Sequence, residues 1–206
     1  MRKFSQLAIV VSHEGNDESA FSAPVVEMTN GSASVQVSDF ESALNMLLPG
    51  SEVIVIARGT VGNKTVHNLA RIIREGCVLV SLDLSEVTEL SRVFDSPFRG
   101  NPNLVSMIFP KNLASINPQA FADCKNLESV SIPATVQKIG AQAFSGCEKL
   151  SKMEFADTGG WLAVHDESKS EAVSNLKNPD DNPYRFTLPS SPYRNCVLQK
   201  KAAGNQ

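Results

Sequence analysis

A repeat of 23 residues is the feature that most constrains how this chain can fold. The stretch INPQAFADCKNL (Ile116–Leu127) returns as IGAQAFSGCEKL (Ile139–Leu150). Residues 104–126 and 127–149 share eight identical positions and three further positions that are apolar in both. A unit this short cannot bury its apolar side chains alone, so successive copies must stack on one another.

Each unit is predicted to contain a short strand followed by turns. Leu104, Met107 and Phe109 indicate a strand with one buried face. Pro110 ends that strand, because proline has no N–H to donate to the next ladder. A second turn is expected to bury Ile116, and the Ala-Phe-x-x-Cys segment then forms a tight helical turn toward the core.

The Phe and Cys positions of the unit are interpreted as parts of the core. Phe98, Phe121 and Phe144 recur at the 23-residue period and should stack as an aromatic spine. Cys124 and Cys147 would lie one strand spacing apart, about 4.8 Å, which by distance alone permits a disulfide. Stacked units hold the two Cβ vectors parallel, whereas a disulfide needs Cβ atoms turned toward each other. Because free cysteine also packs as a small hydrophobe, we interpret both as reduced core thiols.

The units that precede the regular repeats are longer. Strands are predicted at residues 35–37, 51–57 and 79–84. Residues 66–73 predict a helix closed by Gly76, and the capping box of residues 38–41 opens an earlier helix through Leu47. The predicted fold class is therefore α/β, with a single parallel sheet of about six strands. Helices are expected opposite the early units and short helical turns opposite the later ones.

The period divides the chain into three parts. Residues 1–34 are polar and poorly periodic, which predicts a flexible N-terminal lead-in. The repeats occupy residues 35–155, with longer units over 35–78 and units of 23–25 residues over 79–155. Residues 156–206 lose the period and predict a C-terminal cap.

The cap should close the open end of the core. A strand is predicted at residues 161–164, a short helix opening at Asn178-Pro179, and a closing strand at residues 193–198. The aromatic residues of the cap are interpreted as cover for the core rather than as a binding site. They are Trp161, Tyr184, Phe186 and Tyr193.

The repeated pattern IP…V…IG…AF…C…L resembles the leucine-rich repeats of bacterial BspA-like proteins, the Treponema pallidum-type variant in particular, over about residues 35–200. The tail NLKNPDDNPYRF…YRNCVLQK also resembles the cap of treponemal members. Thr135 departs from the commoner leucine-rich motif, which has asparagine at that position. The resemblance implies a right-handed leucine-rich-repeat solenoid whose parallel sheet contacts proteins. Because BspA-like members attach to host components, the resemblance also implies such attachment here. It implies a location at the cell surface or in the periplasm.

Charge and hydropathy exclude some function classes. The formal net charge of -3 offers no basic footprint for nucleic acid. No apolar run approaches the roughly 20 residues that a membrane-spanning helix needs. Arg2 and Lys3 precede the apolar run Leu7–Val11, but His13 cuts it short of a convincing signal-peptide core of about 7–15 residues. The start of this chain therefore leaves export undecided.

No cluster of catalytic or metal-binding residues stands out in the sequence. His13, His67 and His165 fall in the lead-in, a surface helix and the cap, and we interpret them as solvated. No Cys-x-x-Cys pair supports a zinc site. The pair Asp180-Asp181 lacks the alternating ligands and distal Glu of a calcium loop. We therefore predict a protein that is not an enzyme and has no cofactor or metal.

Outward residues of the predicted sheet form the candidate interaction surface. Side chains alternate between the two faces of a strand, so the residues between buried ones point to solvent. The two outward rows are Ser81, Ser106, Ser129 and Lys152, and then Asp83, Ile108, Ser131 and Glu154. Taking Ile54 and Ile56 as the inward pair of their strand adds Val53 and Val55 to these rows.

Two functions of different class follow from this face. In the first, apolar side chains among small serines serve a protein–protein interaction module, which binds a host component if the protein is exported. In the second, Val53, Val55 and Ile108 line a pocket for a small apolar ligand, together with apolar residues of the cap or lead-in. Single exposed apolar residues are also common without any function. An enzyme is the least favoured class, because nothing in the sequence brings its histidines together.

Overall fold

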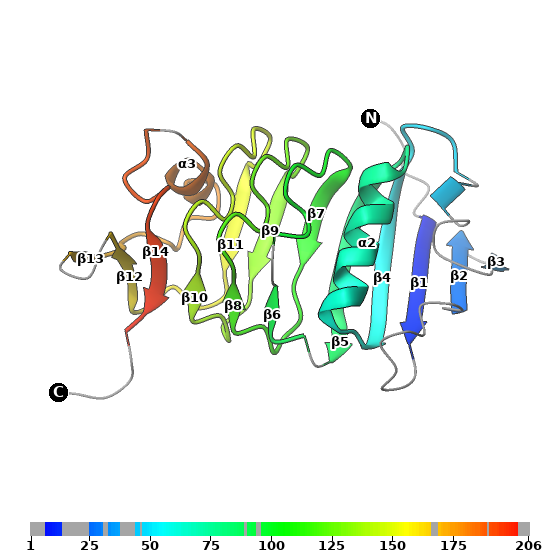
Figure 1. Ribbon diagram of the computed structural model, residues 1–206, viewed down its shortest axis with the longest axis horizontal. Coiled ribbons are helices and arrows are strands. Elements are labelled where there is room, and N and C mark those ends of the chain that lie inside the picture. The colour runs from blue at the N-terminus through cyan, green and yellow to red at the C-terminus, as the bar shows by residue number, and fades with distance from the viewer. Residues whose placement is uncertain are drawn as a thin grey trace.

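Two β-sheets and two helices surround one elongated core in the part of the chain that the structure describes. The computed structural model describes residues 7–13, 25–30, 33–37, 44–45, 47–88, 90–93, 96–165, 169–188 and 190–201. Figure 1 shows the units side by side along the long axis, with the cap at one end and three N-terminal strands at the other.

The first sheet carries the long strands of the units. In spatial order its eight strands are β11 (Lys152–Phe155), β9 (Ser129–Ile132), β7 (Leu104–Ile108), β5 (Leu79–Thr88), β4 (Glu52–Thr60), β1 (Leu7–His13), β2 (Val25–Asn30) and β3 (Ala33–Val37). The five strands from β11 to β4 pair in parallel, and β1 joins β4 in parallel. β2 and β3 follow in antiparallel pairing. The strand predicted at residues 35–37 therefore lies at the sheet edge, and β1 and β2 lie within the predicted lead-in.

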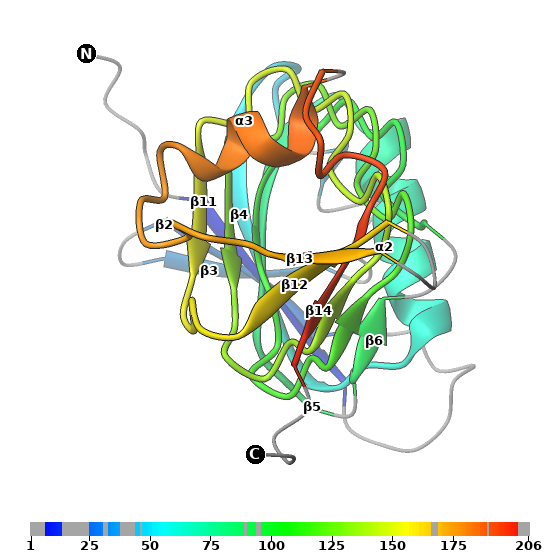
Figure 2. The same cartoon turned by 90° about the vertical axis from the view of Figure 1, so that its left-hand side faces the viewer.

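A second sheet of six strands lies across the core from the first (Figure 2). Its strands are β13 (Ser170–Ala172), β12 (Trp161–Val164), β14 (Val197–Lys200), β10 (Lys138–Ile139), β8 (Ser115–Ile116) and β6 (Arg92–Val93). β6, β8 and β10 are parallel, whereas the cap strands join in antiparallel pairing. The prediction of a single parallel sheet is therefore wrong, and the chain as a whole does not form one regular solenoid. Stacking at strand spacing also brings the turn segments of successive units within hydrogen-bonding distance, which creates the second sheet.

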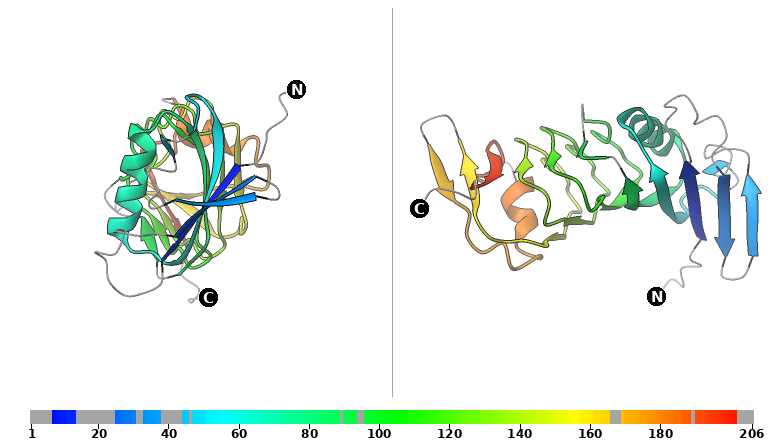
Figure 3. Two further views of the ribbon diagram at one scale, coloured as in Figure 1. Left: turned by 90° about the vertical axis from the view of Figure 1, so that its right-hand side faces the viewer. Right: turned by 90° about the horizontal axis from the view of Figure 1, so that it is seen from below.

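A helix lies opposite the early strands and tight turns lie opposite the later ones. Helix α2 (Asn63–Glu75) covers the first sheet on the same side as the second sheet, as Figure 2 and the left view of Figure 3 show. It ends where predicted, at Gly76, whose N–H donates to the carbonyl of Ile72 at 2.9 Å. The earlier predicted helix falls outside the described residues, except for Leu44 and Asn45, which are helical, and Leu47, which is not. The handedness of the coil stays a prediction.

Two asparagines fasten α2 to the first regular unit. Asn101 Nδ2 donates to the carbonyl of Ala70 at 2.9 Å. Asn103 Nδ2 donates to the carbonyls of Ile73 at 2.8 Å and Gly76 at 2.7 Å. The carbonyl of Ile73 lies in the last turn of α2, where carbonyls have no partner within the helix and must find one outside it. The end of α2 therefore depends on the unit that follows.

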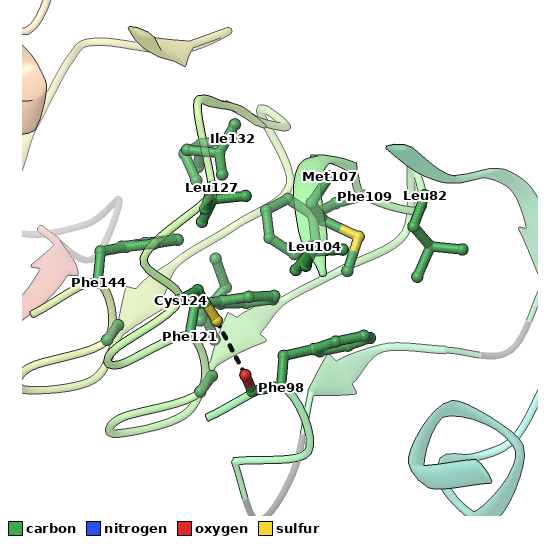
Figure 4. Packing of buried hydrophobic residues seen from close by; sticks show 14 of the residues in the cluster. Leu82, Phe98, Leu104, Met107, Phe109, Phe121, Cys124, Leu127, Ile132 and Phe144 are labelled. Carbon is green, nitrogen blue, oxygen red and sulfur yellow. Dashed lines mark hydrogen bonds between the residues drawn. The ribbon is translucent and has the colours of Figure 1, made fainter. Parts of the chain in front are cut away.

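The predicted aromatic spine is present in the core. The rings of Phe98 and Phe121 stack with centroids 5.3 Å apart, and those of Phe121 and Phe144 with centroids 5.4 Å apart. All three side chains are buried, and Figure 4 shows them in line beneath the first sheet. Equal spacing of the rings follows from equal spacing of the units.

The two repeat cysteines are buried free thiols, as predicted. Cys124 donates its S–H to the carbonyl of Phe98 at 2.9 Å (Figure 4), and Cys147 donates to that of Phe121 at 3.1 Å. Burial raises the pKa of the Cys124 thiol from 9.0 to about 12, so this group stays protonated at neutral pH. Each thiol thus links its unit to the unit before it.

The aromatic residues of the cap cover the last unit, with one exception. Trp161 is buried, and its ring meets that of Phe155 edge-on at 5.6 Å. Phe186, on helix α3 (Asn182–Thr187), is also buried, and its ring centroid lies 6.1 Å from that of Phe155. Tyr184 is 64% exposed, so its predicted role as cover is wrong.

The cap also closes the outer edge of β11. The N–H of Met153 donates to the carbonyl of Pro179 at 2.9 Å, and the carbonyl of Met153 accepts from Asn182 Nδ2 at 2.8 Å. These bonds occupy backbone groups that a further strand would otherwise use. Pro179 and Asn182 of the cap therefore end the first sheet at β11. The division of the chain into domains stays a prediction.

Candidate interaction surface

The outward side chains of the first sheet lie in two rows across successive strands. Strand pairing places Ser81, Ser106, Ser129 and Lys152 in one row, and Asp83, Ile108, Ser131 and Glu154 in the next. Met107 and Val130, which alternate with them along the strands, are buried. The structure thus puts these eight predicted residues together on the face that points away from the core.

Val53 and Val55 do not belong to this face, and their predicted orientation is wrong. Their side chains are 1% and 0% exposed. The outward residues of β4 are Ile54 and Ile56, which pair with Ser81 and Asp83 of β5. Both alternating sets of side chains on this strand are apolar, so alternation alone could not show which set faces the core. Pairing with β5 determines the orientation, because it aligns Val55 with the buried Leu82.

The corrected face is apolar near β4 and β7 and charged at its margins. Ile108 is 45% exposed, and Ile54 and Ile56 are half-buried. At one end of β4, Arg58 forms an ion pair with Glu86 at 2.7 Å. At the far side of the rows, β11 presents the exposed Lys152 and Glu154. The serines between these groups are half-buried and leave the surface shallow.

Asp83 holds a distinct position on this surface. In its row it lies between Ile56 on one neighbouring strand and Ile108 on the other. Its Oδ1 atom accepts the N–H of Ser85 at 2.8 Å, which fixes the carboxylate at the sheet surface. A fixed negative charge therefore stands between two apolar side chains.

The opposite side of the molecule offers a contrasting face. On the second sheet, Arg92, Ser115 and Lys138 lie in one register row. Ser115 is half-buried, like Ser106 and Ser129 on the first sheet. Arginine and lysine beside it make this row cationic, and it has no isoleucine among its members.

The cavities give no support to the second hypothesis, a carrier for an apolar ligand. Val53 and Val55 belong to the packed core. An apolar pocket lies at the seam between the last unit and the cap, lined by residues such as Phe144, Phe186 and Leu198, but its cavity volume of about 10 Å³ holds about one water. A hollow of about 650 Å³ beside α2 is lined by polar and charged residues, among them Lys64 and Arg71.

His165 lies in a polar cluster that the sequence did not reveal. Its Nε2 is 3.1 Å from Glu171 Oε1, and its Nδ1 is 3.2 Å from Cys196 Sγ. The prediction that this histidine is simply solvated is therefore wrong. Cys196 is 31 residues away from His165 in the chain, so no local sequence motif could have predicted the contact. Across the described ranges, no three His, Cys, Asp or Glu side chains are arranged to hold a metal ion.

Parallel strands from 23-residue units, stacked over buried leucines and a phenylalanine spine, are typical of a leucine-rich repeat region. A family model described as the BspA type leucine-rich repeat region matches residues 71–164 in six copies. The chain therefore contains a BspA-type leucine-rich repeat region, as the resemblance implied, although the match is shorter than residues 35–200. A comparison with curated proteins finds no match.

The family match allows a general statement about domains of this type, without identifying a partner. Leucine-rich repeat domains are generally protein-interaction modules and are typically not enzymes. Within the described part of the chain, no helix is long and apolar enough to cross a membrane. The Treponema pallidum-type variant of the repeat stays a prediction.

Proposed function

We propose that this protein is a non-enzymatic protein–protein interaction module that binds its partner through the outward face of the first sheet. The observation that supports this proposal most is the pair of register rows on that face. These rows contain the isoleucines Ile54, Ile56 and Ile108 and the serines Ser81, Ser106, Ser129 and Ser131.

The composition of the face favours a protein partner. Protein interfaces combine an apolar centre that loses its water with a polar rim that stays hydrated. Here the isoleucines form the apolar part, while the Arg58–Glu86 pair and the charges of β11 lie toward the margins. Small serine side chains let a partner approach the sheet closely and offer hydrogen bonds.

The carboxylate of Asp83, between two isoleucines, indicates which kind of side chain the partner places there. Lysine and arginine carry an alkyl stem that packs on apolar surface and a cationic head that binds carboxylates. Asp83, flanked by Ile56 and Ile108, fits both parts of such a side chain. The proposed partner therefore places a basic residue over Asp83.

The family resemblance extends the proposal to the biological setting. BspA-like proteins imply attachment to host components, and we propose the same role for this chain, on the cell surface or in the periplasm. Cell adhesion through the sheet face is the resulting function.

A pair of substitutions tests the binding face. Ser106→Arg with Ser129→Arg fills two adjacent positions of one row with long cationic side chains. We expect binding to an immobilised host-cell surface protein fraction to weaken by about tenfold or more, since bulk at the centre of an interface removes its best-packed contacts. The matched control is Ser115→Arg, a half-buried serine on the second sheet. Equal binding by all variants would contradict the proposal.

A further inference from the structure

Three side chains of the cap form a connected thiol–imidazole–carboxylate cluster. His165 follows β12, Glu171 belongs to β13, and Cys196 precedes β14. The Cys196 Sγ to His165 Nδ1 distance is 3.2 Å, and the His165 Nε2 to Glu171 Oε1 distance is 3.1 Å. The thiol of Cys196 is thus within hydrogen-bond reach of His165, and His165 is within reach of Glu171. This is the order of a nucleophile, its base and the group that orients the base.

The acceptor groups fix where the protons lie when the imidazole is neutral. The ionised carboxylate of Glu171 can only accept, so Nε2 of His165 carries the hydrogen. Nδ1 then has a free lone pair, and the thiol of Cys196 is the group that faces it. The same thiol also lies 3.1 Å from the carbonyl of Pro192, a second acceptor. His165 is therefore placed to remove the thiol proton.

No other described cysteine has this surrounding. Cys124 and Cys147 donate to backbone carbonyls, which cannot take up a proton, and both are buried in the core. Cys77 is exposed. The chain thus carries two inert core thiols, Cys124 and Cys147, as internal references for Cys196.

The resting state of Cys196 is the protonated thiol. Burial is the main cause that raises its pKa, the negative charge of Glu171 adds to it, and Lys169 opposes it. The residue is 3% exposed and lines the narrow seam between the last unit and the cap. A reagent must therefore be small and uncharged and must displace the side chains of this seam to reach the sulfur, and the proton must leave during the reaction rather than before it.

We propose that Cys196 is a site of reversible mixed-disulfide formation with small disulfides, with His165 as the base and Glu171 as its positioning residue. The S–H proton passes to Nδ1 of His165 as the sulfur attacks one sulfur of the disulfide. A new S–S bond forms at Cys196, the S–S bond of the reagent breaks, and the departing thiolate takes the proton from the imidazolium. The cysteine is oxidised to a mixed disulfide, and half of the reagent is reduced to a free thiol.

The test follows this reaction in the full chain with Cys77→Ser, using 2-hydroxyethyl disulfide as the probe. Mass spectrometry of the intact protein and of its peptides measures the rate at each cysteine. We expect Cys196 to react faster than Cys124 and Cys147, and His165→Gln to slow it by about 100-fold, the usual contribution of a general base. Glu171→Gln should slow it less. Fluorescence of Trp161, the only tryptophan, verifies that the cap stays folded in each variant.

The pH profile separates a base from a merely structural histidine. A thiol without a neighbouring base reacts about tenfold faster per pH unit below its pKa, because the thiolate population sets its rate. At Cys196 the proton moves within the cluster, so the rate should change less steeply through neutral pH, and His165→Gln should restore the steep dependence. The proposal is overturned if Cys196 is as slow as Cys124, or if its rate is unchanged in a folded His165→Gln variant. Because these outcomes involve only the cap, they are independent of partner binding by the sheet face.

Discussion

Replacing Phe121 by alanine tests whether the stacked spine holds the repeats together. The ring lies between those of Phe98 and Phe144, at centroid distances of 5.3 and 5.4 Å, and meets Phe109 edge-on at 5.5 Å. Truncation of a buried phenylalanine to alanine costs about 3–5 kcal/mol of the free energy of unfolding. Three ring contacts, each of about 0.5–1.5 kcal/mol beyond burial, place Phe121→Ala at the upper end of that range.

The assay is urea unfolding followed by far-UV circular dichroism and by Trp161 fluorescence. Two probes are needed because stacked units can unfold in parts rather than in one step. The matched control is Phe144→Ala, whose ring stacks on Phe121 alone among the ring contacts of the described residues. We expect this variant to cost about 1–3 kcal/mol less than Phe121→Ala, since it loses two fewer ring pairs of about 0.5–1.5 kcal/mol each. A cost below about 1 kcal/mol for Phe121→Ala, or equal costs for both variants, would refute the reasoning.

Four further predictions rest on the contacts described above. Cys124→Ser should lower the free energy of unfolding by about 1–2 kcal/mol without changing partner binding, because a hydroxyl replaces a core thiol; unchanged stability would contradict its role in packing. The raised pKa of Cys124 favours the protonated thiol in the folded state, so its contribution to stability is complete below pH 9.0 and should be lost as the pH rises toward about 12, which alkaline urea titrations measure. Asn103→Ala should cost about 1–2 kcal/mol and speed hydrogen exchange at the end of α2, since part-buried carbonyls lose their donor; unaltered exchange would argue against the fastening. Asp83→Asn should weaken partner binding by about tenfold and reduce its salt dependence, whereas Glu154→Gln at the margin should do neither; equal effects would remove the basic residue from the proposed partner.

The 23-residue period was enough to predict the core of the repeats, but it was not enough to predict both sheets. Identical spacing of Phe98, Phe121 and Phe144 sufficed to predict the spine, since stacked units must superpose equivalent side chains. The second sheet could not be read in the same way. Its strands β8 and β10 are two residues long, which is too short to show alternation within one unit.

The candidate surface shows the same limit. Alternation gave the correct outward rows where buried leucines and phenylalanines differ clearly from serines, as around Ser106 and Ser129. It failed at Val53 and Val55, because isoleucine and valine alternate there and both sets are apolar. The contact between His165 and Cys196 depends on how the cap folds back, and no period in the sequence encodes it.

The most direct test of the sheet face is site-specific photocrosslinking. A benzophenone amino acid replaces Ile108, the exposed isoleucine of the first sheet, and in a second protein it replaces Ser115 on the second sheet. Both proteins are illuminated in contact with the same host-cell surface protein fraction. We predict a crosslinked partner from position 108 that unlabelled protein competes away and that disappears with Ser106→Arg and Ser129→Arg. Crosslinking from position 115 and none from position 108 would contradict the account.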